Sequence, residues 1–174
     1  LNVNNIIPMT NGTLPIQIAL KVYGNQGEII TTPFSYVATT SSIAWENCIP
    51  VFVDIHPEYL TIDETKIEAA ITSKTTAILA THVYGNPCNV ELIQEIANKY
   101  NLKVIEDAAQ SPGISYKNKP IGAIGHIGGF SLNYHKHIHC GEGGMIVTND
   151  DDLALKSQLI RNHGENSAEV LDKK

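Results

Sequence analysis

Two patterns of apolar and polar residues alternate along the chain. Short continuous apolar runs rich in β-branched residues are typical of strands, whereas apolar residues that recur every three or four positions are typical of helices. The first pattern predicts strands at 28–31, 50–54, 76–80, 103–106, 128–132 and 145–148. The second predicts a helix that starts near residue 13 and helices at 36–46, 63–71, 90–100 and 150–162. This alternation predicts an α/β fold, with a mostly parallel sheet flanked by helices on both faces.

Residue types at the expected helix ends support these boundaries. Thr13 is expected to cap the first helix with its side chain. Asn89 is expected to cap the helix at 90–100, and Asn101 to end it in the left-handed conformation. The connections between elements are therefore expected to be short and well defined.

Composition and charge narrow the class of protein. The chain has 174 residues, enough for one domain, and its hydrophobic content of 43% is ordinary for a globular protein. A net charge of −6 without a basic stripe argues against nucleic-acid binding. No apolar run approaches the roughly 20 residues that cross a bilayer. Because there is no signal-peptide pattern and the three cysteines are widely spaced, we expect a cytoplasmic protein with reduced thiols.

Both ends of the chain suggest a piece of a longer protein. The first residue is Leu1 rather than Met, and residues 169–174 form no closing element. We expect residues 1–174 to be a single domain from a longer chain.

Two residues that could be catalytic follow two of the predicted strands. Asp107 follows the strand at 103–106, and ligands of parallel sheets bind beyond the carboxyl ends of the strands. Lys136 lies between the strand at 128–132 and the Gly-rich turn at 141–144. A lysine can form a Schiff base with an aldehyde cofactor, and a carboxylate can keep a pyridine nitrogen protonated, so the pair predicts pyridoxal 5'-phosphate. The simpler readings are a carboxylate that caps a turn and a solvated surface lysine.

Other residues suit the remaining parts of that cofactor. Gly12 and Thr13 stand at a helix start, where free amides attract a phosphate group, and the hydroxyl of Ser131 could join them. Gln110 could donate to the phenolic oxygen, and Tyr36 could stack on the flat ring. The alternatives are an ordinary capped helix, a strand serine bonded to backbone, an exposed loop glutamine and a tyrosine packed in the core.

A histidine-rich segment offers a competing site. His135, His137 and His139 stand at alternate positions next to Cys140, so an extended backbone would turn the three imidazoles to one side. Imidazole and thiolate suit zinc or copper, but this spacing is not a common zinc pattern and no second cysteine pair exists. We therefore expect no metal, and a polar loop at the rim of a pocket where some histidines touch substrate.

Taken in order, these segments resemble the DegT-type family of sugar aminotransferases, which use pyridoxal phosphate and have the aspartate-aminotransferase fold. The resemblance covers about residues 11–164 and rests on short motifs at 11–13, 32–39, 50–55, 82–87, 106–110, 130–131 with Lys136, 141–144 and 162–164. Each motif is weak alone, but their common order is specific.

The resemblance implies a role for every candidate residue. Lys136 matches the lysine that forms the Schiff base, and Asp107 matches the carboxylate on the pyridine nitrogen. The other matches are Gln110 at the phenolic oxygen, Tyr36 stacked on the ring, and Gly12, Thr13 and Ser131 at the phosphate.

A reaction and partners are implied in the same way. Family members transfer an amino group, commonly from glutamate, to a keto group of a nucleotide-linked sugar, with ping-pong kinetics. Their active sites are shared between two subunits, so a homodimer is expected. They are also longer, which implies that this chain is the large domain without the C-terminal small domain. The alternative is a non-catalytic regulator or sensor that keeps the fold, since some members were first described as regulatory proteins.

Overall fold

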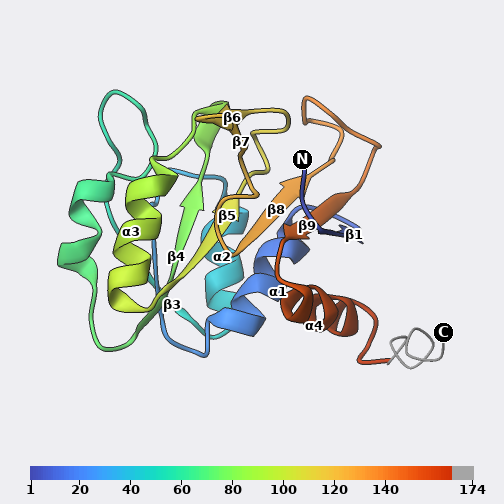
Figure 1. The fold of residues 1–174 in the computed structure, drawn as a ribbon, viewed down its shortest axis with the longest axis horizontal. Coiled ribbons are helices and arrows are strands. Elements are labelled where there is room, and N and C mark those ends of the chain that lie inside the picture. Colours follow the sequence, from blue (N-terminus) through green and yellow to red (C-terminus); the bar gives the residue numbers. More distant parts are fainter. Residues whose placement is uncertain (166–174) are drawn as a thin grey trace.

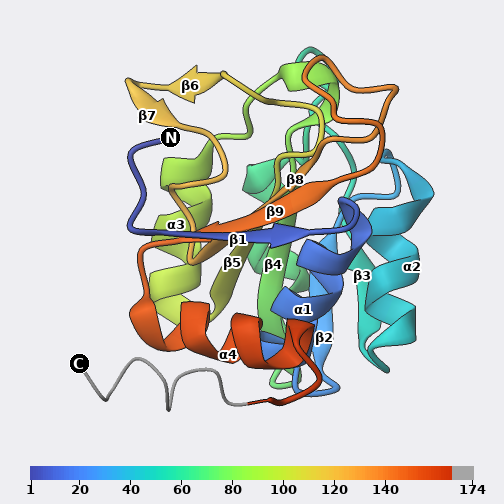
Figure 2. The same cartoon turned by 90° about the vertical axis from the view of Figure 1, so that its right-hand side faces the viewer.

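The computed structural model describes residues 1–165, which form a twisted sheet with helices on both faces (Figures 1 and 2). Its strands are β1 (Asn5–Met9), β2 (Glu28–Thr31), β3 (Ile49–Phe52), β4 (Thr75–Thr81), β5 (Lys103–Asp107), β8 (Ile127–Ser131) and β9 (Gly144–Thr148). Their order is β1-β9-β8-β5-β4-β2-β3. The pairings from β8 to β3 are parallel, whereas β9 runs antiparallel to both its neighbours. The predicted α/β fold class is therefore confirmed.

Apolar cores on the two faces of the sheet hold the helices. The helices of the described residues are α1 (Thr13–Tyr23), α2 (Val37–Trp45), α3 (Val90–Tyr100) and α4 (Asp151–Arg161). On β4 the neighbours Ile78 and Leu79 are both fully buried but belong to different cores, because the pleat turns them to opposite faces. The core around Leu79 includes residues of α1, α2 and α4, and the core around Ile78 includes residues of α3.

Two predicted helix ends are confirmed. The side chain of Asn89 accepts a hydrogen bond from the N–H of Leu92, as an N-cap does. Asn101 ends α3 with φ 55° and ψ 39°, the left-handed conformation that asparagine tolerates.

The segment at 63–71 differs from its prediction. Instead of one α-helix it forms two short 3₁₀ turns, η1 (Glu64–Lys66) and η2 (Glu68–Ala70). Asp63 caps the first turn by accepting from the N–H of Thr65, and Ile71 already has an extended backbone with ψ 131°. Ile67 is buried although the segment contains only short 3₁₀ turns. The i,i+4 spacing of Ile67 and Ile71 was therefore not sufficient evidence for an α-helix.

Strand β1 and a small hairpin were not predicted from the sequence. β1 lies at the edge of the sheet, where it pairs antiparallel with β9 and buries Ile7 and Met9. Its Pro8 is tolerated because an edge strand has one side without partners. The hairpin consists of β6 (Ser115–Tyr116) and β7 (Lys119–Pro120).

A buried carboxylate ties the end of β5 to its surroundings. Glu106 is fully buried and accepts hydrogen bonds from the N–H groups of Gly122 and Ile124, both at 2.8 Å, and of Gly125. Its Oε2 also lies 3.0 Å from Nε2 of His82 at the end of β4. Burial raises the pKa of Glu106, but the hydrogen bonds from His82 and the backbone lower it more, so its net pKa lies below the usual range.

The imidazole of His82 has a partner on each nitrogen. Nδ1 accepts from the N–H of Cys88 at 3.1 Å, so the ring proton is on Nε2 and is donated to Glu106. The backbone of His82 is equally engaged, since its N–H donates to the carbonyl of Asp107 and its carbonyl accepts from the hydroxyl of Ser111. This network joins the ends of β4 and β5 to the loop at 122–125.

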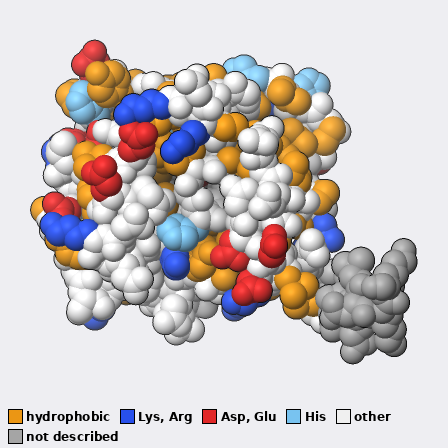
Figure 3. Space-filling view, viewed as in Figure 1, with side chains coloured by type: hydrophobic (Ala, Val, Ile, Leu, Met, Phe, Trp, Pro, Cys, Tyr) orange, Lys and Arg blue, Asp and Glu red, His pale blue; other side chains and the backbone are white. Residues whose placement is uncertain are grey.

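On the surface, acidic and basic side chains are interspersed on the face shown in Figure 3. None of the helices within residues 1–165 has the length and apolar character needed to cross a membrane.

Replacing Glu106 by glutamine would place an NH₂ group against backbone donors that now meet a carboxylate. We expect Glu106→Gln to lower the free energy of unfolding by about 3 kcal/mol, because buried donors lose their acceptor. Glu68→Gln is the control, since the Glu68–Lys99 pair at 2.8 Å is exposed and should hardly affect the urea midpoint. Equal midpoints for the two variants in urea titrations would show that the Glu106 network does not anchor the fold.

Candidate active site

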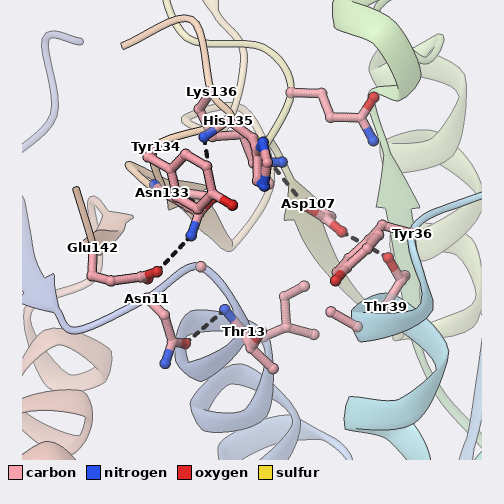
Figure 4. Close-up of a pocket in the computed structure, with 16 residues that line it drawn as sticks. Asn11, Thr13, Tyr36, Thr39, Asp107, Asn133, Tyr134, His135, Lys136 and Glu142 are labelled. Carbon is pink, nitrogen blue, oxygen red and sulfur yellow. Dashed lines mark hydrogen bonds between the residues drawn. The ribbon is translucent and has the colours of Figure 1, made fainter. Parts of the chain in front are cut away.

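A cavity of about 650 Å³ opens where β5 and β8 end, beside the start of α1 (Figure 4). Because β5 and β8 are parallel, their carboxyl ends meet at the same edge of the sheet. All seven residues predicted for the site line this cavity: Gly12, Thr13, Tyr36, Asp107, Gln110, Ser131 and Lys136. The structure therefore gathers residues that are more than a hundred positions apart in the sequence.

At one end of the cavity lies the start of α1. Asn11, not Thr13 as predicted, caps this helix: its Oδ1 accepts from the N–H groups of Thr13 and Leu14, both at 3.0 Å. The capping role passes to Asn11 because Gly12 is the helix N-cap in backbone position and has no side chain. Because Asn11 caps the helix, the Thr13 hydroxyl does not, and it can donate a hydrogen bond at the cavity.

Gly12 lies directly against Ser131 at the end of β8. A Cβ atom at position 12 would be 2.4 Å from the Cβ of Ser131, so only glycine fits there. The close approach places the positive end of the α1 dipole beside the Ser131 hydroxyl. Such a pairing of a helix start with a hydroxyl suits an anion such as phosphate.

Asp107 is the buried acid of the cavity. Its Oδ2 accepts from the hydroxyl of Thr39 at 2.9 Å, and its Oδ1 accepts from the N–H of Ala109 at 3.2 Å. Burial raises the pKa of this carboxyl, and the two hydrogen bonds, His82 and Lys136 offset only part of the increase. The site thus holds a carboxylate that would gain from a further cationic or N–H partner.

Lys136 lies in the loop between β8 and β9. The loop is closed by hydrogen bonds from the N–H of Leu132 to Gly143 and from the N–H of Tyr134 to Gly141. The side-chain amide of Asn133 also donates to Glu142 at 2.7 Å. Lys136 is half-buried at the cavity, and its charge reaches Asp107. The Gly-rich turn therefore holds the loop that carries the amine.

Gln110 is oriented by an unusual backbone. Its Oε1 accepts from the N–H of Tyr84 at 2.7 Å, which leaves the NH₂ group as the donor available to the cavity. Tyr84 has φ 57° and ψ 19°, the left-handed region, which costs a residue other than glycine conformational energy. This contact could not be predicted from the sequence, because it joins two loops.

Tyr36 and the histidines lie at the rim. Tyr36 stands just before α2, is 69% exposed and turns its ring toward the cavity in Figure 4. Of the histidine cluster, only His135 lines the cavity, and its ring is 3.8 Å from that of Tyr134 between centroids. His137 and His139 are exposed. Within residues 1–165, no group of three His, Cys, Asp or Glu side chains is placed to hold a metal ion.

Eight further residues line the cavity without having been proposed as functional: Asn11, Ile16, Ala38, Thr39, Ala109, Asn133, Tyr134 and Glu142. Thr39 lies one helical turn after Tyr36, which is the signal that could have identified it. Asn133 and Glu142 lie at the two ends of a loop, and the hydrogen bond between them could not be predicted from the sequence.

Comparison with known proteins adds to this geometry. A family model described as the DegT/DnrJ/EryC1/StrS aminotransferase family matches residues 1–173. GDP-perosamine synthase from Caulobacter vibrioides is 42% identical over 164 residues, which cover 93% of this chain and 44% of that protein. The pleiotropic regulatory protein of Geobacillus stearothermophilus is 46% identical over 157 residues, which cover 88% and 42%. The chain thus spans less than half the length of these curated relatives.

Solved structures show the same fold. An aminotransferase from Psychrobacter cryohalolentis matches with a TM-score of 0.95 and 38% identity, over 99% of this chain and 45% of that one. NtdA from Bacillus subtilis, solved with bound cofactor PMP, matches with a TM-score of 0.84 and 36% identity, over 90% of this chain and 36% of that one.

The buried charge of Asp107 predicts how the ligand-free protein responds to pH. Because the folded pKa is raised, stability is lost as the pH rises from the unfolded to the folded pKa. We expect Asp107→Asn to raise the free energy of unfolding by about 1 kcal/mol at neutral pH and to give no gain below about pH 3. Urea titrations at both pH values measure this. The exposed Asp152→Asn should show no such gain, and a loss of stability in Asp107→Asn at neutral pH would contradict the prediction.

Proposed function

Because the chain belongs to the DegT/DnrJ/EryC1/StrS aminotransferase family, we propose that it is the large cofactor-binding domain of a pyridoxal-phosphate-dependent sugar aminotransferase. The observation that carries the proposal is the placement of Lys136 and Asp107 in one cavity with the start of α1 and Ser131. An amine and a carboxylate thus share a cavity with an anion-binding helix start. An aldehyde-bearing pyridine with a phosphate group requires this combination.

The cavity fits pyridoxal 5'-phosphate on structural grounds. The raised pKa of Asp107 indicates a carboxylate whose protein partners do not fully offset its burial, and a protonated ring nitrogen would supply the missing partner. Because Gly12 has no side chain, the backbone of the helix start lies directly against Ser131, where a Cβ atom would clash. The volume of about 650 Å³ is typical of cofactor sites.

Each residue has a defined task in this proposal. When bound, the cofactor supplies an electron-withdrawing ring that stabilises negative charge on the neighbouring carbon. Lys136 would hold the cofactor through Nζ and, once released, would move a proton between adjacent carbons as base and then as acid. The Asp107 carboxylate would keep the proton on the ring nitrogen. The NH₂ group of Gln110 would donate to the phenolic oxygen, Tyr36 would stack on the ring, and Gly12, Thr13 and Ser131 would bind the phosphate.

The substrates and assembly follow from the family and a named relative. Similarity to a GDP-perosamine synthase supports a nucleotide-linked keto sugar as the acceptor of the amino group. We propose glutamate as the amino donor, a homodimer as the assembly and the cytoplasm as the location. We further propose that His135, which lines the cavity at its rim, touches the sugar substrate.

A second candidate is a regulator that binds the cofactor without turnover. The similarity to a pleiotropic regulatory protein favours it. The enzyme remains the better supported function, because Lys136, which can transfer protons, stands in the same cavity as Asp107.

Chemical trapping tests the cofactor site. Pyridoxal phosphate is added to the full-length protein, reduced with borohydride, and mapped on peptides by mass spectrometry. We expect the label on Lys136 and its loss in Lys136→Ala, because the cavity favours an amine held near Asp107. Lys99→Ala, which removes an exposed lysine of α3, is the control and should label as the wild type does. Label spread over surface lysines in the wild type would reject the site.

Turnover separates the enzyme from the regulator. We expect the full-length protein to transfer the amino group of glutamate to a GDP- or dTDP-linked keto sugar, with parallel double-reciprocal plots as ping-pong kinetics require. Lys136→Ala should abolish transfer. Trapping of the cofactor on Lys136 together with no turnover over a panel of such sugars would favour the regulator.

A further inference from the structure

A row of hydroxyl groups leads to the Asp107 carboxylate. Thr39 Oγ1 lies 2.9 Å from Asp107 Oδ2 and 2.6 Å from Ser35 Oγ, and Ser35 Oγ lies 3.5 Å from Thr81 Oγ1. Thr39 is fully buried in the first turn of α2, and Thr81 ends β4 beside the end of β5. Figure 4 shows the contact between Thr39 and Asp107 at the edge of the cavity.

The direction of these hydrogen bonds follows from the number of hydrogens. An ionised carboxylate only accepts, so Thr39 donates its single hydroxyl hydrogen to Asp107 Oδ2. Thr39 Oγ1 must then accept from Ser35, whose single hydroxyl hydrogen goes to this contact of 2.6 Å rather than to Thr81 at 3.5 Å. Both donations run toward the carboxylate, and hydrogen bonds arranged in series strengthen one another.

We propose, resting on the proposed function, that Thr39 is a positioning residue whose hydroxyl, oriented by Ser35, keeps the Asp107 carboxylate ionised and turned toward the ring nitrogen of the cofactor. Thr39 itself is not required to touch the reacting atoms. Its effect is transmitted through Asp107.

Two protein donors fix the carboxylate. The N–H of Ala109 holds Oδ1 and the hydroxyl of Thr39 holds Oδ2, so the plane of the group is set before a ligand arrives. Each oxygen keeps a lone pair for a further partner. A carboxyl group that lost the Thr39 donor could rotate and would protonate more readily, and a neutral acid cannot hold a proton on the ring nitrogen.

Among the groups around Asp107, the Thr39 hydroxyl does most to keep the carboxylate ionised. Burial raises the pKa of Asp107, and the hydrogen bond from Thr39 is the largest influence that opposes it, ahead of the Ala109 N–H. His82 and then Lys136 lower the pKa less. The neighbouring Glu106 and His82 are occupied with each other on the network that joins β4 and β5.

Valine has nearly the shape of threonine and lacks the hydroxyl, so Thr39→Val separates hydrogen bonding from packing. Thr39→Ser keeps the hydroxyl and should restore function, and Ser35→Ala removes only the second donor. Thr31→Val is the matched control, because Thr31 is also fully buried but donates to the carbonyl of Leu79 instead.

Two measurements on the full-length protein carry the test. The first is the pKa of the Asp107 carboxyl without cofactor, from ¹³C NMR with the signal assigned by Asp107→Asn. The second is the affinity for pyridoxamine phosphate. We expect Thr39→Val to raise the pKa by about one unit and weaken binding about tenfold, because a hydrogen bond to a charged group is lost. Ser35→Ala should shift both values less in the same direction, and Thr39→Ser and Thr31→Val should resemble the wild type.

The outcomes separate this inference from the function on which it rests. A wild-type protein that binds no pyridoxamine phosphate would reject the proposed function. Normal wild-type binding with the same Asp107 pKa and affinity in Thr39→Val as in Thr31→Val would overturn the role of Thr39 alone. If Thr39→Val does not fold, Ser35→Ala decides: an unchanged pKa and affinity there would overturn the series of donors.

Discussion

Two adjacent carboxylates at the end of β5 organise both the fold and the site. The pleat of the strand turns Glu106 and Asp107 to opposite faces of the sheet. Glu106 meets three backbone N–H groups and the imidazole of His82, so its charge is satisfied within the protein. Asp107 meets only Thr39 and the N–H of Ala109, and its pKa stays raised. The first acid therefore fixes the end of the strand, and the second is left in need of a ligand at the position so fixed.

The layers of the fold could be predicted because they depend on local periodicity. The continuous apolar run at 77–80 and the apolar pair at 104–105 identified two buried parallel strands, which bury apolar residues on both faces. The segment at 63–71 was predicted wrongly because a single i,i+4 pair is satisfied by two 3₁₀ turns as well as by a helix. Strand β1 was not predicted, because it is a short edge strand that contains Pro8 and has few residues typical of strands. It is defined by its pairing with β9.

The site was predictable where chemistry follows a strand end, and less so where it depends on contacts between distant segments. Asp107 and Ser131 fall at carboxyl ends of parallel strands, which is a rule of topology. The capping of α1 by Asn11 rather than Thr13 depends on one backbone conformation, which the order of side chains does not reveal. The hydrogen bond from Thr39 to Asp107 joins residues 68 positions apart and forms only when the chain has folded.

In the proposed complex, charges of opposite sign would meet at two places in the cavity. The positive end of the α1 dipole would face the phosphate, and Asp107 would face the protonated ring nitrogen. Without the cofactor, the hydrogen bonds to Asp107 do not fully offset the free-energy cost of burying its charge. Tyr84 also has a strained backbone conformation where its N–H binds Gln110. Binding the cofactor supplies the missing partners and stabilises the folded state by the free energy of binding. The local instability of the free site and its affinity for the cofactor thus have the same physical source.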